Sequence, residues 1–482
     1  MLRRGITRAL LAGVSVIALL STGTTAQAAP VSVTNKTQFT DTDGAVIHAH
    51  GGGVIKVGSF YYWFGENRNA DNTFKAVSMY RSTDLKSWVF QRDVLTSASH
   101  SELASAKIER PKVIYNSTTG KYVMWMHKEQ GLPANHYTEA RAAVAVSDTI
   151  DGDYTWQGSF RAPDDATSRD QTLFKDSDGS AYQITSSDQN ADLHIYKLNA
   201  SYTGYDRLVA NPWDGKYREA PALFKRDGVY FMLTSGNSGW SPNQQKYATA
   251  TSLAGPWTAM ADVGDSEGYG SQTAFVLPVQ GTSGTSYLYM GDRWGNSFGG
   301  TVNDSQYVWL PLKFPTRTTM TMPYYPQVTI DTATGTVSGS GGGPYYNLVA
   351  RHSQKCVDIS DNSAANKATV LQYTCNGGLN QQWRTVDRGD GYVSLKAQHS
   401  GKCLDVSGAS VEDRGVVQQY DCTGSTNQQW KLQDQGDGHY RLVARHSGKC
   451  LDVSGVSTAD GARLFQYTCG SGANQQFKRP AV

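Results

Sequence analysis

The first 355 residues of this 482-residue chain contain no cysteine, and all six cysteines follow that point. Charged residues are also scarce, at 18% of the chain, and no block of one sign occurs. This composition argues against a nucleic-acid partner and against a polybasic membrane-binding patch. The chain lacks a Gly-rich phosphate loop and a G-x-S-x-G nucleophile motif. Since no His, Asp and Glu residues show convincing catalytic-metal spacing, we expect no cofactor and no catalytic metal.

Long apolar runs are missing as well. The longest, from Leu10 to Leu20, covers about half of the ~20 residues that a bilayer-spanning helix needs. Three arginines precede it and Ala26-Gln27-Ala28 follows, which is the pattern of a secretory signal peptide over residues 1–28. Its removal changes the formal charge from +2 to 2 − 3 = −1. We therefore expect a secreted, extracellular protein without a membrane partner.

Glycine and aromatic residues are abundant, with 49 Gly, 27 Tyr and 11 Trp. Between residues 30 and 336, short β-type runs alternate with turns rich in Gly, Asp and Asn, which indicates an all-β domain. A loose unit of two strands and a polar loop ending in Trp recurs. At roughly 45–60 residues per unit, this length fits five or six blades of a β-propeller, and we expect five. The runs cover residues 54–57, 60–64, 122–127, 142–146, 229–233 and 287–290.

The cysteines belong to a threefold repeat. The two cysteines of each pair are 19 residues apart, and successive pairs are offset by 47 residues. Each repeat has a Lys-Cys-Val/Leu-Asp segment and closes on Asn-Gln-Gln-Trp or Asn-Gln-Gln-Phe. An even cysteine set in an exported chain implies disulfides, and the repeat favours pairing within each copy. The expected bonds are Cys356–Cys375, Cys403–Cys422 and Cys450–Cys469.

These repeats resemble the ricin B-type lectins, or family 13 carbohydrate-binding modules. The Q-x-W signature of that family stands at Gln381/Trp383 and Gln428/Trp430, while Phe477 replaces the third Trp. The resemblance implies a β-trefoil over residues 345–480, in which these aromatic residues belong to the core. We expect Ser338 to Pro344 to lie in a flexible Gly/Ser linker over residues 337–344.

One sugar pocket is expected in each repeat, built from an aromatic platform and polar groups for the sugar hydroxyls. The alternative is that the Asp and Asn side chains only cap turns. Three weak pockets would act together along a polymer. Position 470 is Gly where the first two repeats carry Asn376 and Thr423, so we expect the third pocket to be weaker. The candidates are Asp358, Tyr373, Asn376, Asn380 and Gln381, then Asp405, Tyr420, Asn427 and Gln428, then Asp452, Tyr467, Asn474 and Gln475.

The front domain resembles glycoside hydrolase family 43, and in particular its exo-β-1,3-galactanase branch. The segments that carry the resemblance are His48 to Gly53, Phe64 to Arg68, Ile108 to Val113, Ser168 to Asp170, Arg218 to Pro221, and Gly270 to Thr273.

The family resemblance implies three catalytic residues. Glu219 matches the general acid, and Glu109 matches the carboxylate that orients this acid and tunes its pKa. Most members carry an early Asp as general base, but His48 to Gly51 offers no carboxylate, and Gln272 matches the glutamine that holds the water in the galactanase branch. A neutral amide is not a base in its usual form. Two roles for Gln272 are therefore left open: it acts as an imidic acid tautomer, or it only positions the water while another group takes the proton. Glu66 and a His at position 48 or 50 are the rival bases.

Further residues are expected to bind substrate: Glu66, Tyr137, Asp170, Asn190, Asn237 and Trp240. Arg169 is expected to compensate the charge of Asp170. The sequence leaves open whether the propeller channel holds a structural calcium ion.

The sequence thus predicts a monomeric, inverting exo-β-1,3-galactanase that releases galactose from the β-1,3-galactan backbone of arabinogalactan and is anchored to polysaccharide by its lectin. Two alternatives remain, an α-L-arabinofuranosidase or β-xylosidase of the same family and a non-catalytic glycan-binding protein. Glu109 and Glu219 favour an enzyme.

Overall fold

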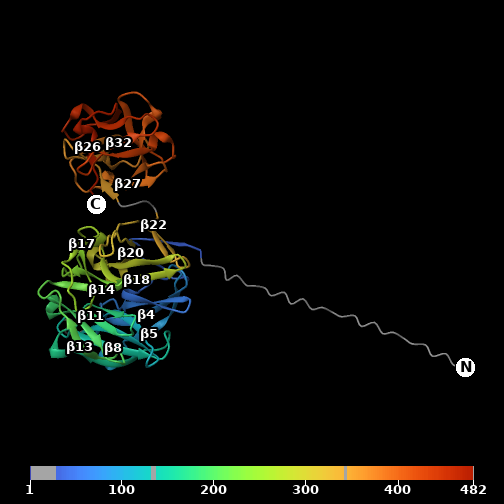
Figure 1. Cartoon of the computed structure of the whole chain (residues 1–482), viewed down its shortest axis with the longest axis vertical. Helices are drawn as coiled ribbons and strands as arrows, with labels where there is room; N and C mark the ends of the chain where they lie inside the picture. Colours follow the sequence, from blue (N-terminus) through green and yellow to red (C-terminus); the bar gives the residue numbers. More distant parts are fainter. Residues whose placement is uncertain (2–28, 132–136, 341–344, 481–482) are drawn as a thin grey trace.

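The computed structural model describes residues 1, 29–131, 137–340 and 345–480, so the predicted signal peptide lies almost wholly outside the described residues. Two all-β domains follow one another along the chain (Figure 1). Within the described part, no helix is long and apolar enough to cross a membrane. Helical structure there is limited to short 3₁₀ turns: η1 Ser101–Leu103, η2 Pro163–Asp165, η3 Asp188–Asn190, η4 Gly268–Gly270, η5 Gly295–Phe298, η6 Val302–Asp304, η7 Ser360–Asn362, η8 Leu379–Gln381, η9 Ser407–Ala409, η10 Thr426–Gln428, η11 Ser454–Val456 and η12 Ala473–Gln475.

The first domain is a five-bladed propeller, as the sequence predicts. Each blade is an antiparallel sheet whose first strand lies nearest the central axis, and these first strands are neighbours around a ring. The blades are β2 His50–Val57, β3 Phe60–Arg68, β4 Phe74–Ser82 and β5 Val89–Thr96; β6 Lys107–Asn116, β7 Lys121–Glu129, β8 Arg141–Ser147 and β9 Thr155–Phe160; β10 Gln171–Lys175, β11 Ala181–Ser187, β12 Asp192–Leu198 and β13 Tyr205–Ala210; β14 Arg218–Arg226, β15 Val229–Gly236, β16 Gln245–Ala250 and β17 Ala261–Val263; and β18 Gln272–Gly281, β19 Gly284–Arg293 and β20 Gln306–Leu312.

The second strand of a blade is covered on both faces by neighbouring blades. For this reason β3, β7 and β15 are almost continuously buried and read as unbroken apolar runs rather than as alternating patterns. The β2–β3 hairpin turns at Gly58, whose φ of 60° suits a residue without a side chain. All six β-type runs of the sequence fall within strands.

The ring is closed by the N-terminal segment. β1, Val31–Thr34, pairs antiparallel with β21, Gln327–Asp331, which pairs in turn with β22, Thr336–Ser340. Residues 36 and 37 then exchange backbone hydrogen bonds with Tyr307 of β20, which adds an outer segment to the three-stranded fifth blade. The two ends of the domain are therefore held together by main-chain pairing.

The predicted linker, residues 337–344, begins too early. Residues 337–340 belong to β22, and Val337 is 4% exposed in the propeller core. The Gly/Ser composition predicts a flexible segment, but residues 337–340 pair with β21, which provides partners for their backbone groups. The rest of the predicted linker, residues 341–344, lies outside the described part of the chain.

The second domain is a β-trefoil with three four-stranded repeats and an entering strand, β23 Tyr345–Asn347. The last strand, β35, pairs with both β24 and β32 and so closes the barrel. The repeats are β24 Val349–Ala350, β25 Cys356–Ile359, β26 Val370–Tyr373 and β27 Gln382–Asp387; β28 Tyr392–Ala397, β29 Cys403–Val406, β30 Gly415–Tyr420 and β31 Trp430–Asp434; and β32 His439–Ala444, β33 Cys450–Val453, β34 Leu464–Tyr467 and β35 Phe477–Lys478.

The three Q-x-W aromatic residues fill the centre of this barrel. Trp383, Trp430 and Phe477 are all fully buried in one apolar cluster. Trp383 and Trp430 each donate the indole N–H to a backbone carbonyl, 3.0 and 3.1 Å away, in the strand that follows the first cysteine of the repeat. They are core residues, as expected.

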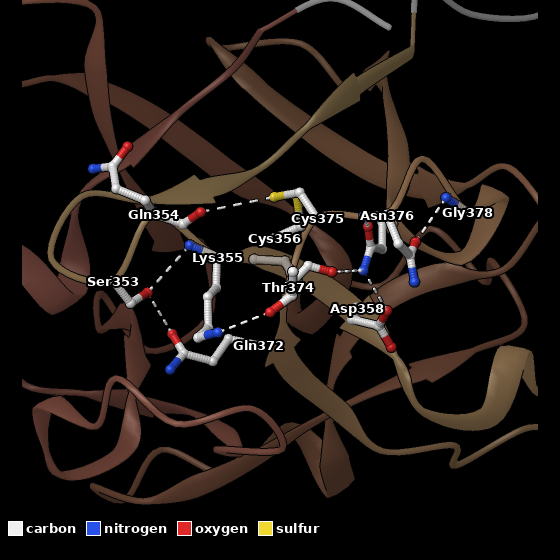
Figure 2. The surroundings of a disulfide bond; sticks show 12 residues. Ser353, Gln354, Lys355, Cys356, Asp358, Gln372, Thr374, Cys375, Asn376 and Gly378 are labelled. Atoms are coloured by element: carbon white, nitrogen blue, oxygen red, sulfur yellow. Dashed lines mark hydrogen bonds between the residues drawn. A yellow bond between two sulfur atoms is a disulfide. The ribbon is translucent and has the colours of Figure 1, made fainter.

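Each disulfide joins the ends of a hairpin inside one repeat, which confirms the predicted pairing. Figure 2 shows the first, Cys356–Cys375, where Lys355 also donates a 2.9 Å hydrogen bond to the Thr374 hydroxyl. The bond and the polar contacts hold the hairpin end beside the predicted sugar pocket.

Removing one disulfide is expected to destabilise the trefoil by about 3 kcal/mol, since closing a loop of this size restricts the unfolded chain. In the variant with Cys403→Ala and Cys422→Ala, scanning calorimetry of the full chain should show a lower midpoint for one transition and an unchanged midpoint for the other. Equal shifts in both transitions would show that the bond does not act on the trefoil alone.

Candidate active site

A cavity of about 240 Å³ opens where the innermost strands of the blades begin. A size of this order suits a sugar-sized ligand. The residues that line it come from all five blades: Glu66, Arg68, Glu109, Arg110, His127, Tyr137, Arg169, Asp170, Asn190, Glu219, Asn237, Gly239, Trp240, Gln272 and Trp294.

Four of the five inner strands shift register within their first residues. The shifts fall after His50 in β2, Glu109 in β6, Glu219 in β14 and Thr273 in β18. A bulge of this kind re-aims a side chain, and the residue after each Glu takes a positive φ, 53° at Arg110 and 52° at Ala220. Non-glycine residues in that conformation are strained, so the surrounding contacts must hold them in place.

Glu219 has the environment of a general acid. It is 7% exposed; Oε1 accepts a hydrogen bond from Gln272 Nε2 at 2.9 Å and Oε2 accepts one from Asn190 Nδ2 at 3.0 Å. Burial first, and then the charge of Asp170, raise the pKa of Glu219 to about 8. A carboxyl group in this state stays protonated at neutral pH and can give its proton to a leaving oxygen.

Glu109 is held in the opposite protonation state. Burial would raise its pKa, but Arg68 and His127 outweigh this effect and hold the pKa of Glu109 well below its usual range. Arg68 Nη2 lies 2.9 Å and the Tyr137 hydroxyl 2.7 Å from Glu109 Oε1, and His127 Nδ1 lies 3.0 Å from Oε2. Glu109 therefore keeps a negative charge in the cavity, whereas Glu219 is a neutral acid. The resemblance implies that Glu109 tunes this acid, but the carboxylate that raises the pKa of Glu219 is Asp170, and the groups that orient it are Gln272 and Asn190.

Gln272 is fixed by four hydrogen bonds. Its Oε1 accepts from Arg110 Nη2 at 2.6 Å and from Trp294 Nε1 at 2.8 Å. Its Nε2 donates to Glu219 Oε1 and, at 3.0 Å, to the Ser235 hydroxyl. Because the Arg and Trp groups can only donate, they determine which end of the amide faces Glu219.

Glu66 is clamped rather than free. Its Oε2 accepts from Arg68 Nε at 3.0 Å, and its Oε1 accepts from the backbone N–H of Arg110 at 2.8 Å. Burial raises the pKa of Glu66 despite the Arg68 charge. The backbone of Gly51 approaches so closely that a Cβ there would lie 2.2 Å from Glu66 Oε1, which explains a Gly at this position.

Asp170 pairs with Arg110, and not with Arg169 as the sequence suggested. Arg110 Nε lies 2.9 Å from Asp170 Oδ1, and the backbone N–H of Ala220 donates to Oδ2 at 3.1 Å. The Arg169 guanidinium donates instead to the Tyr137 carbonyl and to Gln189. Arg169 and Asp170 are adjacent in sequence, but their side chains point in different directions at the entrance to β10 and therefore have different partners.

The remaining predicted substrate-binding residues also line the cavity. Tyr137 contacts Glu109, and Asn190 contacts Glu219 while its Oδ1 is buried without a partner among the described residues. Asn237 is exposed at the rim. Trp240 is half-buried and meets Trp294 edge to face, with ring centroids 5.3 Å apart.

Several residues of the site were not predicted from the sequence. Arg68, Arg110 and Trp294 set the charge or orientation of the predicted residues, and His127, whose pKa contacts with Glu109 and Glu129 raise to about 9 against the effect of burial, supplies a positive charge. The signal available for Arg68 and Arg110 was their place inside the motif segments 64–68 and 108–113. His127 ends the strand-like run 122–127 and Trp294 directly follows β19, and neither belongs to a motif segment.

Neither histidine near the start of β2 lines the cavity. His50 is fully buried, with Nδ1 3.1 Å from Asp292 Oδ1, and burial lowers the pKa of His48 to about 4. Asp292 Oδ2 also accepts the backbone N–H of Gly51 at 2.8 Å. This network supports the first inner strand, where the early Asp is missing.

One group of described residues has ligand atoms close enough for a metal ion, namely Glu109, His127 and Asp170, all within 4.8 Å of one another. Arg68 and Arg110 already pair with its two carboxylates. We derive no metal chemistry from it.

Comparison with known proteins agrees with this geometry. The family model for glycosyl hydrolases family 43 matches residues 50–267, and that for ricin-type beta-trefoil lectin domains matches residues 334–420, 388–467 and 426–481. An exo-beta-1,3-galactanase from Clostridium thermocellum is 48% identical, covering 94% of this chain and 100% of its own, with a TM-score of 0.66. The chain belongs to glycoside hydrolase family 43.

Two other solved structures of this family are similar. A beta-1,3-galactosidase solved with galactodeoxynojirimycin is 33% identical over 60% of this chain and 98% of its own, with a TM-score of 0.56. A variant of an exo-beta-1,3-galactanase from Phanerochaete chrysosporium, solved with beta-1,3-galactotriose, is 29% identical over 94% and 92%, with a TM-score of 0.62. A search of curated proteins found no match. This family 43 protein is a glycoside hydrolase with a C-terminal ricin-type lectin domain.

The predicted lectin pockets share one arrangement. In each repeat a buried Asp accepts two hydrogen bonds, of 2.8 to 3.0 Å, from the Asn and Gln of the closing motif. The nearby tyrosines are solvent-accessible, with Tyr373 44% and Tyr467 41% exposed and Tyr420 half-buried. An exposed ring beside a fixed carboxylate provides the platform and acceptor expected of a sugar site.

Two kinds of predicted lectin residue have local contacts instead. Gln381, Gln428 and Gln475 are buried, and each also bonds backbone groups of its own repeat, so they orient the Asp rather than face a sugar. The Asn376 side chain accepts the backbone N–H of Gly378 at 2.9 Å and caps a turn (Figure 2).

The second pocket differs from the other two. Gln418 Nε2 donates to Asp405 Oδ1 at 2.9 Å, so both oxygens of Asp405 have protein partners. The equivalent positions of the first and third repeats are Leu371 and Phe465, which cannot donate. The sequence predicts a weaker third pocket because Gly470 replaces a polar residue. The structure adds a second difference, since the carboxylate of the middle pocket is occupied by Gln418.

Replacing Gly51 with Ala is expected to lower kcat/KM by about 100-fold, because the added methyl displaces Glu66 and an ångström of misplacement has that effect. The measurement is the rate of sugar release from the polysaccharide substrate. Gly58→Ala is the matched control, since it has a φ of 60° but no atom within 4 Å of its Cβ. A similar loss in both variants would attribute the effect to backbone strain.

The activity is expected to fall as the pH rises through about 8, where Glu219 loses its proton. Asp170→Asn removes the like charge and leaves Arg110 unpaired, so both effects lower the pKa of Glu219. In this variant, the fall of kcat/KM on the alkaline side of the pH profile should therefore begin at a lower pH. Asp227→Asn, outside the cavity, serves as control, and an unmoved limb in Asp170→Asn would contradict the assignment of Glu219.

Proposed function

We propose that this protein is a secreted, inverting exo-β-1,3-galactanase that releases galactose from the β-1,3-galactan backbone of arabinogalactan. The observation that carries the proposal is the 2.9 Å hydrogen bond from Gln272 to the buried Glu219, in a cavity where Arg68 and His127 contact Glu109. Burial raises the pKa of Glu219, and the two cations lower that of Glu109. The relatives named as β-1,3-galactanases and a β-1,3-galactosidase support the substrate.

In the proposed reaction, Glu219 gives its proton to the glycosidic oxygen as the bond from that oxygen to the anomeric carbon breaks. Water attacks the anomeric carbon from the opposite face and inverts it, and the proton that this water loses passes to solvent, from which Glu219 is protonated again for the next cycle. Glu109 keeps its charge throughout and, with Arg68, orients the sugar hydroxyls. The Asp170 charge beside Glu219 keeps the acid protonated until the leaving oxygen takes the proton.

Gln272 is proposed to act as an amide that positions the water rather than as an imidic acid. All four of its hydrogen-bonding positions have protein partners here, so it must exchange one of these partners for the water when the sugar binds. In the imidic acid form Oε1 would carry a hydrogen, yet Oε1 faces Arg110 and Trp294, which are both obligate donors. The hydrogen-bond pattern therefore favours the amide, with positioning as its role.

The lectin domain is proposed to keep the enzyme on its polymer. Three separate pockets on one domain raise the local concentration of polysaccharide at the propeller even when each pocket binds weakly. A signal peptide over residues 1–28 is consistent with three disulfides, which form in oxidising compartments.

Product analysis on debranched β-1,3-galactan tests the proposal, with arabinoxylan as control substrate. Wild-type protein should release free galactose, initially as the α-anomer by NMR, and Glu219→Gln should lower kcat by at least about 100-fold while binding is retained. Gln replaces a protonated carboxyl group closely in shape, so the fold is expected to persist. Release of arabinose or xylose from the control would favour the arabinofuranosidase or xylosidase, and binding without any release would favour a lectin.

A further inference from the structure

A second groove lies on the propeller beside the active site. It has a volume of about 510 Å³ and is lined by the segment before β14 and the first residue of β14, by Lys246 of β16 and by the segment before β17. It shares no lining residue with the catalytic cavity. The two are nevertheless neighbours, because Arg218 lines the groove and the next residue, Glu219, lines the cavity.

Aromatic and sulfur-containing side chains form one wall of the groove. Trp213 and Trp257 lie with ring centroids 5.3 Å apart, and both pack against the core of the third and fourth blades. Trp257 and Met260 are only half-buried, so part of their apolar surface faces the groove. The indole N–H of Trp257 is already bonded to the Leu253 carbonyl at 3.2 Å, which fixes the ring. A fixed, partly exposed indole is a suitable surface for a sugar ring.

The charge of the groove has one sign. Lys216, Arg218 and Lys246 line it, and no acidic residue does. Lys246 pairs with Asp262 at the edge, but Lys216 is exposed and has no ion-pair partner within the described residues.

Arg218 is the decisive residue. It is 7% exposed, yet within the described chain it lies within 4.0 Å of no carboxylate, and it bonds only the Thr234 hydroxyl and two backbone carbonyls. Burial lowers its pKa to about 10, so it still carries a positive charge. The two other buried arginines of this end of the propeller, Arg68 and Arg110, both pair with carboxylates. Because a buried charge is normally paired, an unpaired guanidinium at a groove suggests an anionic ligand.

We propose that this groove binds a uronic-acid residue of a glycan. The sugar carboxylate contacts Arg218 and Lys216, and the sugar ring lies against the exposed part of Trp257. A carboxylate on an apolar ring matches a groove that combines cations with an indole wall. The proposal does not depend on which polymer is cleaved in the catalytic cavity.

Calorimetric titration of the full chain with methyl β-glucuronide and methyl β-glucoside tests this site, since the two ligands differ mainly in the carboxylate. The glucuronide is expected to bind at least about fivefold more tightly, and less tightly as salt is raised. Lys216→Glu should weaken glucuronide binding about fivefold or more, whereas Lys86→Glu, an equal charge change on an exposed loop of the first blade, should not.

Equal affinity for both ligands, or glucuronide binding that is insensitive to Lys216→Glu, would overturn the proposal. A short oligoglutamate is tested as a competitor. If it displaces the glucuronide and binds more tightly, the proposal is overturned in favour of a protein partner. Sugar release from a neutral galactan is measured in the same variants. It is expected to be unchanged in Lys216→Glu, so failure of the uronate site and failure of the galactanase assignment are separate results.

Discussion

The geometry of the catalytic cavity depends on the buried guanidinium of Arg110. It pairs with Asp170 at the entrance of the third blade and donates to Gln272 and to the Thr273 carbonyl of the fifth. The backbone N–H of the same residue bonds Glu66 in the first blade, and its carbonyl accepts from Gln171. Asp170 extends the network to the fourth blade through the N–H of Ala220. Arg110, through its side chain, its backbone and its partner Asp170, thus connects the blades that carry the acid, the amide and the clamped glutamate.

The conformation and burial of Arg110 are energetically unfavourable, and other contacts in the fold must offset this cost. Arg110 has a positive φ and a charge that is removed from solvent, and each is unfavourable by itself. Both become tolerable because the first, third and fifth blades each contribute a hydrogen-bond or ion-pair partner to Arg110. The same network creates the electrostatic asymmetry of the site, since Asp170 raises the pKa of Glu219 whereas Arg68 and His127 lower that of Glu109.

The two domains reach stability in different ways. The propeller has no cysteine and relies on apolar contacts between blades and on pairing of its ends. The smaller trefoil closes three hairpins with disulfides around a core that includes Trp383, Trp430 and Phe477. Small domains bury a smaller share of their surface, so covalent cross-links make a larger relative contribution there.

Features repeated or signalled locally could be predicted from the sequence alone. The 47-residue repeat favours cysteine pairing within each copy, its resemblance to ricin B-type lectins implies the trefoil, and apolar runs such as 60–64 predict strands. Glu109 and Glu219 stand out because each lies in a motif segment that matches the family. Only the tertiary structure decided what surrounds them. The partner of Asp170 is Arg110 rather than the adjacent Arg169. Gln418 donates a hydrogen bond to Asp405, and the propeller domain extends to residue 340. The physical reason is that protonation states, partners and strand pairing depend on groups far apart in the chain, which come together only when the ring of blades closes.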